Sequence, residues 1–571
     1  MNKTLFKLLI KSIDKPKFIL GLFMSFIGTS LALFLPQFIG KLLDEHFLKM
    51  AINNPSILVV SAAFFIIVYS LQAFSSYIIG ICGSRSLNKL QKHIYSSLLR
   101  TSVKELDKYK AGDLSSRLTN DMSVVLNFIT VVFPNLILNL IVIIGSVYFL
   151  LKINLSLALM SLSLFPILLF VIIPINNKLE DYYADYQGGL GEISSRISHK
   201  FTHIRLMKAF NGEENEQKVM SNSFDRLTKN FNKIVGWSSF QNTLVNGLMM
   251  SFIILLLVVA GLEVSKGSMT MSTLMTFVLY MTQLIDPITD VSESMAELTE
   301  FKSVSNRLIE ILELSKEENK TVGQNFLTSN IVMKNVDFAY NQDNVLENLS
   351  VTVEPGQHIA IVGPSGAGKT TIFSLLMKFY QNYRGEILIG NHNLSELSEE
   401  QIRNMIAYIP QDNTLFYGTI KDNLLYGKNQ SVSEERVDEL LRELGLMKLV
   451  QGLEKGLDTE ITDSGTGLSE GQKQRFSIAR ALLLEHPIYL LDEITASLDS
   501  VTERIISKAI DKLTAGKTRL TIAHRLHTVK EADSILVLDK GGQVVDFGTH
   551  NQLIARNQLY NDFLSGIQQA S

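Results

Sequence analysis

Residues 363–370 read Gly363-Pro-Ser-Gly-Ala-Gly-Lys-Thr370 and decide how the second half of the chain folds. They match the pattern G-x-x-x-x-G-K-[ST] in full. The preceding residues 359–362 are apolar and largely β-branched, which predicts a buried strand, and residues 371–378 have the periodicity of a helix. Between a strand and a helix, such a glycine loop turns its backbone N–H groups inward around phosphate oxygens.

The loop is therefore the main candidate binding site of the chain. Lys369 would reach the terminal phosphates of a nucleotide, and the hydroxyl of Thr370 would bind Mg²⁺. A chance glycine turn is the alternative, and the strand before the loop and the helix after it argue against that alternative. The candidate phosphate-binding residues of this segment are Gly363, Ser365, Gly366, Ala367, Gly368, Lys369, Thr370 and Thr371.

The length of 571 residues is enough for about three or four domains of ~150 residues each. Up to about residue 290, long apolar runs alternate with basic stretches, and after about residue 325 the pattern is that of a soluble α/β domain. With a net charge of -3, the chain lacks the excess of basic residues that is typical of a nucleic-acid-binding protein, so no nucleic-acid partner is expected. Cys82 is the only cysteine, which excludes an intrachain disulfide and a cysteine-rich zinc site, and its apolar surroundings predict a buried side chain.

The first half predicts an all-α membrane domain that lies in a lipid bilayer. Residues 1–16 place lysines on one side and leucines on the other, which favours an interfacial amphipathic helix over an ordinary surface helix. Crossing a bilayer takes ~20 apolar residues. Six runs meet this length, at 18–40, 56–80, 128–150, 154–176, 241–264 and 269–290. The predicted division is a membrane domain over 17–316, a linker over 317–327 and a soluble domain over 328–571.

The distribution of Lys and Arg predicts the orientation of these runs. Basic residues are frequent in the long segments after the second and fourth runs and are few in the short connections. This asymmetry places the N-terminus, both long segments and the soluble half in the cytoplasm, with the runs crossing the cytoplasmic (inner) membrane. The long segments are predicted to be helical extensions of the runs, with turns near 113–121 and 205–214.

Polar residues within the six runs are mostly uncharged amides and hydroxyls. An ion or proton pathway usually contains ionisable groups buried inside the membrane, whereas the charges of these runs, such as Glu263 and Asp286, stay near the ends. A cavity lined in this way suits amphipathic or apolar molecules. For any single amide or hydroxyl, contact between neighbouring helices is the alternative interpretation.

Further motifs accompany the glycine loop in a fixed order along the soluble half. They combine an aromatic residue, two polar side chains that follow predicted strands, a polar helix start and an apolar strand that ends in two acids. In chain order they are Tyr340; Gln411 after the strand 405–409; Leu468-Ser-Glu-Gly-Gln472; Asp492 and Glu493 after the strand 488–491; Ala496-Ser-Leu-Asp499; and His524 after the strand 519–523.

With these motifs in order, residues 328–571 resemble the nucleotide-binding domain of ABC transporters. Together with the six runs, the whole chain resembles an ABC exporter half-transporter of the bacterial multidrug and lipid-flippase subfamily. Segments 112–121, 204–210 and 267–287 of the membrane half also resemble that family. The resemblance implies a six-helix membrane domain with long cytoplasmic extensions, joined to an α/β P-loop ATPase domain.

The resemblance also implies a role for each matching residue of the ATP site. Tyr340 would stack on adenine, and Asp492 would hold Mg²⁺ through water. Gln411 would contact Mg²⁺ or the attacking water, so the metal ligands would be Thr370, Gln411 and Asp492. Glu493 would polarise that water and His524 would contact the γ-phosphate, which makes Glu493, His524 and Gln411 the candidate catalytic residues.

The segment 468–472 has a different implied role, because in this family it closes on the ATP held by the opposite domain. Its residues are Leu468, Ser469, Glu470, Gly471 and Gln472, and Ser497 and Asp499 of the following D-loop accompany it. One chain carries one phosphate loop and one such segment, which implies a dimer with a second half-transporter and two ATP molecules. Because Glu493, His524, Ser469 and Gly471 are all present, a homodimer is favoured over a heterodimer. Glu470 stands where the family usually has glycine and is expected to point outward.

The leading functional hypothesis is ATP-driven export of hydrophobic or amphipathic compounds, as in multidrug efflux by alternating access. A lipid flippase, a peptide exporter or an importer of the same fold are alternatives. The runs contain no Arg or Lys cluster for a charged lipid headgroup, which disfavours the flippase. An intact Glu493 disfavours an ATP-gated channel, and the six runs exclude a soluble ATPase of DNA repair or chromosome organisation. The sequence does not identify the substrate.

Overall fold

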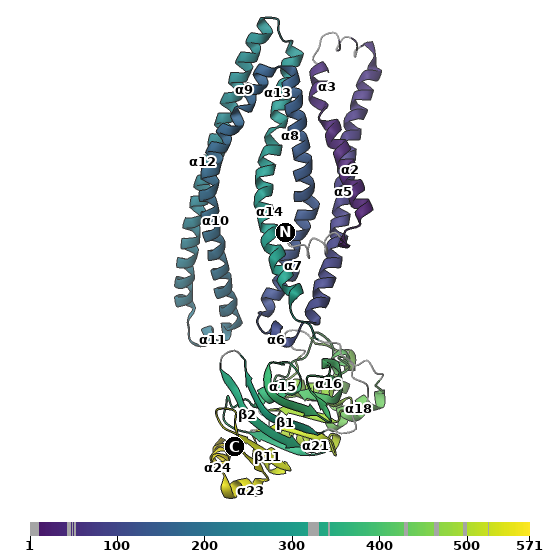
Figure 1. Cartoon of the computed structure of the whole chain (residues 1–571), viewed down its shortest axis with the longest axis vertical. Coiled ribbons are helices and arrows are strands. Elements are labelled where there is room, and N and C mark those ends of the chain that lie inside the picture. Colours follow the sequence, from purple (N-terminus) through teal and green to yellow (C-terminus); the bar gives the residue numbers. More distant parts are fainter. Residues whose placement is uncertain are drawn as a thin grey trace. The chain divides into compact units, whose positions relative to one another are not determined.

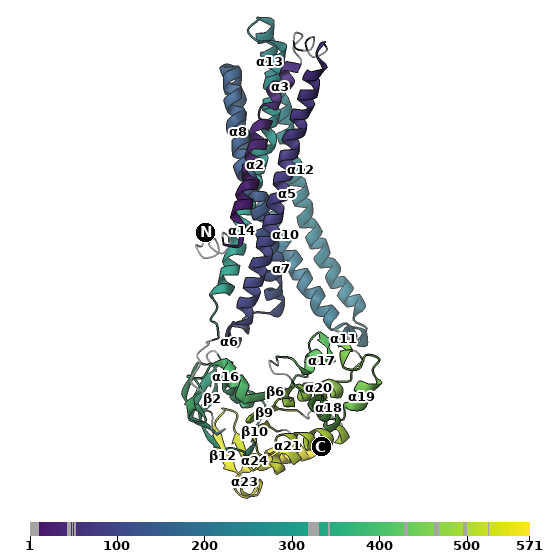
Figure 2. The same cartoon turned by 90° about the vertical axis from the view of Figure 1, so that its right-hand side faces the viewer.

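The computed structural model describes residues 11–42, 47, 50, 53–317, 330–340, 343–427, 432–461, 467–494, 500–523 and 525–570. The chain divides into two compact units (Figures 1 and 2). The first, here called the membrane unit, comprises the chain up to Tyr95 together with Gly112–Leu312. The second, here called the nucleotide unit, comprises Ser96–Ala111 together with the chain from Glu313 onward.

The described part of the membrane unit is helical, and several long helices are built from shorter ones in direct succession (Figure 1). Breaks between them follow local chemistry: Asn154 caps α9 by accepting a hydrogen bond from the Leu157 N–H at 3.1 Å, and Thr270 caps α13 in the same way. The helices are α2 Lys15–Ala32, α3 Leu35–Leu42, α5 Pro55–Leu99, α7 Ala111–Asn127, the π-helix η1 Phe128–Val132, α8 Phe133–Ile153, α9 Leu155–Leu162, α10 Leu164–Thr202, α11 Ile204–Ala209, α12 Glu213–Ser265, α13 Met271–Gln283 and α14 Ile285–Glu313.

Five helical stretches of the described residues are long and apolar enough to cross a membrane. They are Lys15–Leu42, Val59–Leu99, Ala111–Ile153, Leu155–Thr202 and Glu213–Ser265, and they overlap the first five predicted runs. The sixth predicted run, 269–290, is helical in α13 and α14 but is divided at Leu284 and leads into a polar helix. A sixth crossing therefore stays a prediction. Most of the predicted interfacial helix, at residues 1–10, lies outside the described residues.

One of the two predicted cytoplasmic turns is wrong. Residues 113–121 lie inside α7, and the chain reverses earlier, around the short helix α6 (Val103–Leu106). Asp113 pairs with Arg117 one turn further along α7, at 3.1 Å, a spacing that stabilises a helix. The other predicted turn is confirmed: α11 ends at Ala209, and Asn211 adopts a left-handed φ of 49° before α12 begins.

Cys82 is buried, as predicted.

Within the described residues, the nucleotide unit contains three sheets. The largest has the strand order β12-β11-β3-β10-β9-β6, in which only the pairing of β11 with β12 is antiparallel. A second sheet has the order β2-β1-β4-β5, and β7 pairs with β8. The strands are β1 Ile331–Ala339, β2 Asn344–Val353, β3 His358–Val362, β4 Tyr383–Ile389, β5 His392–Asn393, β6 Ile406–Ile409, β7 Gly418–Thr419, β8 Glu460–Ile461, β9 Ile488–Asp492, β10 Thr518–Ile522, β11 Ser534–Leu538 and β12 Val544–Gly548.

Helices cover these sheets and complete the hydrophobic cores of the nucleotide unit. The main core packs Phe373 and Leu376 of α15 against residues of both larger sheets, and a second core packs α20 against β6 and β9. The helices are α15 Lys369–Leu376, α16 Glu399–Met405, α17 Ile420–Leu424, α18 Glu434–Glu443, α19 Met447–Gly452, the 3₁₀-helix η2 Gly456–Asp458, α20 Glu470–Leu482, α21 Ser500–Leu513, α22 Leu526–Glu531, α23 His550–Arg556 and α24 Gln558–Ala570.

The segment Ser96–Ala111 belongs to the nucleotide unit although it lies within the residues predicted for the membrane domain. Its backbone is paired with the segment that leads into the nucleotide unit: Ser102 N–H donates to Ser315 O at 3.0 Å, and Glu317 N–H donates to Arg100 O at 2.9 Å. The hydroxyl of Tyr380 donates to the carboxylate of Asp107. The nucleotide unit therefore contains an insertion from far upstream in the sequence.

His358 occupies a buried position at the start of β3. Its Nδ1 lies 2.8 Å from Nη2 of Arg519, and its Nε2 lies 3.1 Å from the hydroxyl of Thr521. Because a guanidinium can only donate, Nδ1 accepts and the ring proton is on Nε2. Burial, together with the positive charge of Arg519, lowers the pKa of His358 to about 3. The imidazole is therefore neutral in the folded protein at physiological pH.

This buried histidine is expected to make the nucleotide unit sensitive to acid. Below pH ~6.5 the unfolded chain binds a proton at His358 that the folded chain excludes until about pH 3. The free energy of unfolding should therefore decrease on acidification, by up to about 1.4 kcal/mol per pH unit from this group. In His358→Gln, where an uncharged amide oxygen can still accept from Arg519, the decrease between pH 7 and pH 5 should be smaller. Chemical unfolding measures this free energy at each pH. If it decreased equally with acidification in both proteins, the assigned effect of His358 would be contradicted.

Candidate functional site

The phosphate loop joins β3 to α15 in the middle of the large parallel sheet. β3 lies between β10 and β11, and β9 lies on the other side of β10. Because these strands are parallel, their carboxyl ends share one edge of the sheet, where ligands of open α/β sheets bind. The loop after β3 and the acids at the end of β9 therefore meet at the same edge.

Two glycines give the loop its shape. Gly366 and Gly368 have φ values of 82° and 79°, a left-handed conformation that other residues rarely adopt. A Cβ atom on Gly368 would lie 2.6 Å from Leu346 and 2.8 Å from the carbonyl oxygen of Val345. Only glycine fits there, and α15 begins at the next residue. The loop thus presents a helix N-terminus beside a tight backbone turn, which is a favourable environment for an anion.

Lys369 lies at this helix start with its side chain folded back over the loop. Its Nζ donates hydrogen bonds to Gly363 O at 2.9 Å and to Pro364 O at 3.0 Å. Burial lowers the pKa of Lys369, and the negative charges of Glu493 and Asp492 partly offset this effect. A phosphate oxygen would replace neutral carbonyl partners with a stronger, charge-assisted hydrogen bond.

Asp492, the last residue of β9, is a buried carboxylate with an exposed fraction of 2%. Burial, together with the nearby charge of Glu493, raises its pKa to about 6, although a hydrogen bond with Thr370 acts in the opposite direction. The hydroxyl of Tyr408 lies 3.4 Å from its Oδ2, whereas its Oδ1 has no hydrogen-bond partner among the described residues. A buried carboxylate oxygen without a partner costs free energy, so this site fits a cation or an ordered water.

Glu493 follows with an unusual backbone conformation. Its φ of 48° is left-handed, which is rare for a residue with a side chain and is often found at functional sites. Its Oε2 accepts a hydrogen bond from Nε2 of Gln411 at 2.8 Å. The structure therefore brings together two residues for which the family resemblance implies contact with the attacking water.

Tyr340, which follows β1, is held in place by two other aromatic rings. The rings of Phe338 and Tyr380 each pack edge-on against it with centroids 4.9 Å away, and its hydroxyl lies 3.2 Å from that of Thr371. With 42% of the residue exposed, it is available for stacking against a planar ligand. The bond to Thr371 of α15 places it beside the phosphate loop.

The segment 468–472 forms a separate helix start. Ser469 caps α20 in a capping box: its Oγ accepts from the N–H of Gln472 at 3.3 Å, and Oε1 of Gln472 accepts from the N–H of Ser469 at 2.9 Å. Glu470 is exposed in the single chain and pairs with Lys473 at 2.9 Å; its orientation in a dimer stays a prediction. Among the described residues, no hydrogen bond or ion pair joins this segment to the phosphate loop of the same chain.

Three predicted site residues lie outside the described residues, namely His524, Ser497 and Asp499. Their roles stay predictions. Conversely, sequence reasoning missed Tyr408, whose hydroxyl contacts Asp492, and Tyr380, which supports the ring of Tyr340. The signal for Tyr408 was its position on the strand just before Gln411, because a tyrosine in a buried strand needs a partner for its hydroxyl.

Comparisons with known proteins agree with this architecture. The family model described as the ABC transporter transmembrane region matches residues 18–288, and the one described as ABC transporter matches residues 346–496. A multidrug resistance ABC transporter ATP-binding and permease protein of Lactococcus lactis subsp. lactis is 32% identical over 575 residues, which cover 99% of this chain and 96% of that protein. The chain belongs to the ABC transporter family. An ATP-dependent lipid A-core flippase of Syntrophus aciditrophicus is 29% identical over 552 residues, which cover 95% of this chain and 91% of that protein.

As an ABC exporter, this protein combines a multi-pass membrane region with a unit that binds and hydrolyses ATP to drive transport. The helical membrane unit and the mixed-sheet nucleotide unit match the fold predicted from the sequence. The chain carries one transmembrane region and one ATPase unit, so this ABC transporter is a half-transporter that works as a dimer.

Proposed function

We propose that this ABC transporter exports hydrophobic or amphipathic compounds across the cytoplasmic membrane as a homodimer, in the manner of multidrug efflux. The observation that carries the proposal is a cavity of about 310 Å³ within the membrane unit. Helices α8, α9, α10, α12, α13 and α14 surround it. Leu168, Met249, Met281 and Ile288 are among the residues that line it. Thr289 is the one polar residue among the described residues that line it, and none of them is charged.

The chemistry of this cavity selects for uncharged, apolar parts of a molecule. Burying apolar surface contributes about 25 cal/mol per Å², whereas moving an unpaired charge into such a site is very costly. The flexible thioethers of Met249 and Met281 can adapt to ligands of different shape. The cavity therefore favours a range of lipophilic compounds over one ligand with a fixed polar pattern.

The ATP site supports a hydrolytic cycle with Mg²⁺. The residues fit this ion: Asp492 has a buried oxygen without a partner among the described residues, and Thr370 and Gln411 offer further oxygens. When bound, Mg²⁺ would neutralise charge on the phosphates. Lys369 and the loop would hold the phosphates, Tyr340 would stack on adenine, and Glu493 would orient the attacking water, with His524 contacting the γ-phosphate.

The proposed dimer explains the position of Ser469. In one chain its helix start is exposed and, within the described ranges, has no hydrogen bond to the phosphate loop, so the N-terminus of α20 can meet ATP held by the second copy. ATP that bridges two copies binds the closed state better than the open one, which is the differential affinity needed to drive a conformational change. The proposal includes six crossings with the N-terminus and the nucleotide unit in the cytoplasm, and the predicted domain boundaries.

Lipid transport is the second candidate, because relatives of similar coverage are named lipid A-core flippases. The apolar cavity would accept acyl chains as well as drugs. It offers no cationic side chain among its described residues for a phosphorylated headgroup, which is why we place this candidate second. We rank a peptide exporter, an importer and an ATP-gated channel below both.

The proposal predicts ATP-dependent uptake of a lipophilic fluorescent dye into inside-out membrane vesicles that contain this transporter. Uptake should disappear in Glu493→Gln, which is expected to bind ATP without turning it over. Vesicles made without the transporter provide the background. A wild-type transporter that hydrolyses ATP but moves none of a panel of such dyes would overturn the proposed cargo, and labelled lipids and peptides would be tested next.

A further inference from the structure

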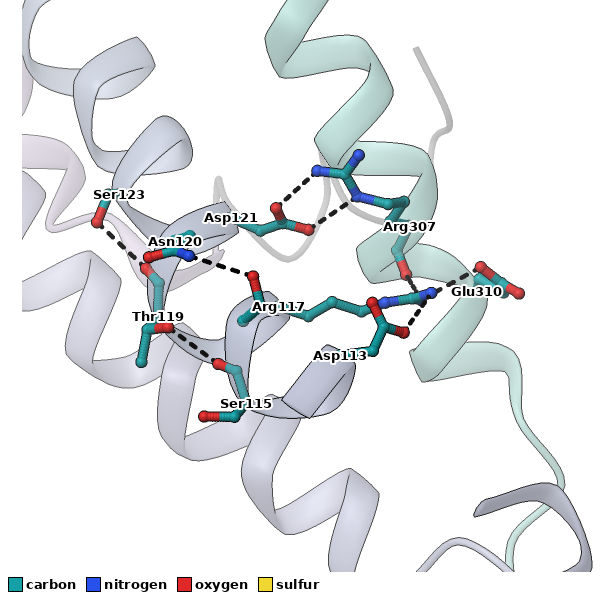
Figure 3. Close-up of polar contacts among 10 residues, drawn as sticks. Asp113, Ser115, Arg117, Thr119, Asn120, Asp121, Ser123, Arg307 and Glu310 are labelled. Atoms are coloured by element: carbon teal, nitrogen blue, oxygen red, sulfur yellow. Dashed lines mark hydrogen bonds and ion pairs between the residues drawn. The ribbon is translucent and has the colours of Figure 1, made fainter. Parts of the chain in front are cut away.

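The chain passes between its two compact units at three points, after Tyr95, after Ala111 and after Leu312. α7 begins at the second of these crossings, and α14 ends at the third. Near these ends the two helices are joined by a group of charged side chains, shown in Figure 3. We call this group the α7–α14 clamp; it consists of Asp113, Arg117 and Asp121 of α7 and Arg307 and Glu310 of α14.

The first part of the clamp is a two-pronged ion pair between Asp121 and Arg307. Arg307 donates from Nε to Oδ2 of Asp121 at 3.0 Å and from Nη2 to Oδ1 at 2.6 Å. The Asp121 side chain is only 9% exposed. A bidentate pair of this kind fixes both distance and orientation, and its partial burial shields it from solvent and salt.

The second part of the clamp is centred on Arg117, whose side chain is 10% exposed. Its Nη2 lies 3.1 Å from Asp113 on its own helix. Its Nη1 donates to Oε2 of Glu310 at 3.2 Å and to the backbone oxygen of Arg307 at 3.1 Å. Because a buried guanidinium needs partners, withdrawing the end of α14 from α7 would leave Arg117 poorly paired.

The helical stretch that begins with α7 and continues through η1 and α8 also contacts α14 at positions further from Ala111 and Leu312, where the chain passes between the two units. Asn127 donates to Glu297 at 3.3 Å, and Asn139 of α8 donates to Asp290 at 3.2 Å. Next to the first of these contacts, the rings of Phe128 and Phe301 stack with centroids 3.8 Å apart and an interplanar angle of 8°. Phe128 begins the π-helix η1, and such insertions are frequent at functional positions of long helices. The clamp thus ends a continuous line of contacts along α14.

We propose that Arg117 and Asp121 are positioning residues that make α7 and α14 respond together when ATP moves the nucleotide unit. The nucleotide unit is covalently attached to both helices, through Ala111 and through Glu313. Without the clamp, each helix end could follow its own attachment. With it, a displacement at either crossing reaches both helices, which gives the segment 112–121 a role in coupling hydrolysis to transport.

Charge reversal in the full-length transporter tests this inference. Asp121→Arg and Arg307→Asp should each keep ATP binding, since neither residue lies in the ATP site, and should lower substrate uptake per ATP hydrolysed by about tenfold. The double variant Asp121→Arg/Arg307→Asp restores opposite charges and should recover most of the coupling. Lys302→Glu, an exposed charge of α14 outside the clamp, is the matched control and should behave as wild type.

Hydrogen exchange gives a readout that does not depend on the substrate. Adding ATP to the non-hydrolysing Glu493→Gln transporter should change exchange in α7 and α14 together. The same experiment with Asp121→Arg added should change exchange in only one of the two helices, and the double charge reversal should restore the joint response. Joint responses in the single reversals, together with an unchanged uptake per ATP, would overturn the inference.

Milder variants test the proposal if a charge-reversed protein does not fold. Asp121→Asn keeps the shape of the side chain without its charge, and Arg307→Lys keeps the charge without the two-pronged geometry. Both should remain folded by thermal unfolding and show a smaller loss of coupling than the reversals. Wild-type coupling in folded Asp121→Asn would equally reject the role of the clamp.

Discussion

Replacing Glu493 with glutamine is expected to lower ATP turnover by about 10²–10⁴-fold while ATP still binds. An amide has nearly the same shape and can keep a contact with Gln411, but it cannot accept a proton from an attacking water. The strained φ of 48° would be the same in both proteins, so the change isolates the carboxylate. Phosphate release at saturating ATP measures turnover, and retention of labelled ATP by the purified protein measures trapping.

Glu485→Gln is the matched control for this experiment. Glu485 is an exposed acid near the opposite end of β9 and pairs only loosely with Lys517, at 3.5 Å, so its loss should leave turnover unchanged. If Glu493→Gln hydrolyses ATP at the wild-type rate, Glu493 is not the base. The proton of the water would then have to go to another group at this edge of the sheet.

Lys369→Ala is expected to weaken ATP binding by about 100-fold or more. A hydrogen bond to a charged group contributes about 1.5–3 kcal/mol, and Lys369 would make such bonds to two phosphates. The variant also leaves the carbonyl oxygens of Gly363 and Pro364 without the ammonium that now joins them. Titration with a fluorescent ATP analogue in the presence of Mg²⁺ measures the affinity directly.

Lys334→Ala provides the comparison for the loss of a positive charge as such. Lys334 forms an exposed ion pair with Glu386 at 3.1 Å, and such a pair contributes little to stability. The Lys334→Ala variant should therefore bind ATP as the wild type does. An unchanged ATP affinity in Lys369→Ala would show that the glycine loop is not the phosphate site. The assignment of Thr370 and Asp492 would fail with it.

The phosphate loop was predictable because its structure depends on residues that are neighbours in sequence. A β-branched strand, glycines that can adopt left-handed conformations and a helix start directly after Gly368 are all local features. The family resemblance added the roles of Asp492 and Glu493 at the end of β9, and these acids lie beside the loop only because of the strand order. That order, with β10 between β3 and β9, comes from long-range pairing and is not encoded in any short segment.

The predicted turn at 113–121 failed for the opposite reason. Its aspartates, serines and asparagine favour turns and helix ends locally, but contacts with α14 hold it as a helix. Arg117 and Arg307 are separated by 190 residues, so no local pattern could reveal their contact. Tertiary contacts of this strength override the local propensity of a segment. Tyr408 was missed similarly, since its contact with Asp492 requires β6 to lie beside β9.

The insertion of Ser96–Ala111 into the nucleotide unit has a consequence for the biogenesis of the protein. During synthesis, Asp107 leaves the ribosome long before its partner Tyr380, and the helices α7 to α14 are made in between. The ATPase therefore cannot be completed from its own contiguous stretch of chain. It has to wait for a piece that is already tethered to inserted membrane helices. The nucleotide unit is therefore completed only after the membrane helices α7 to α14 have been synthesised.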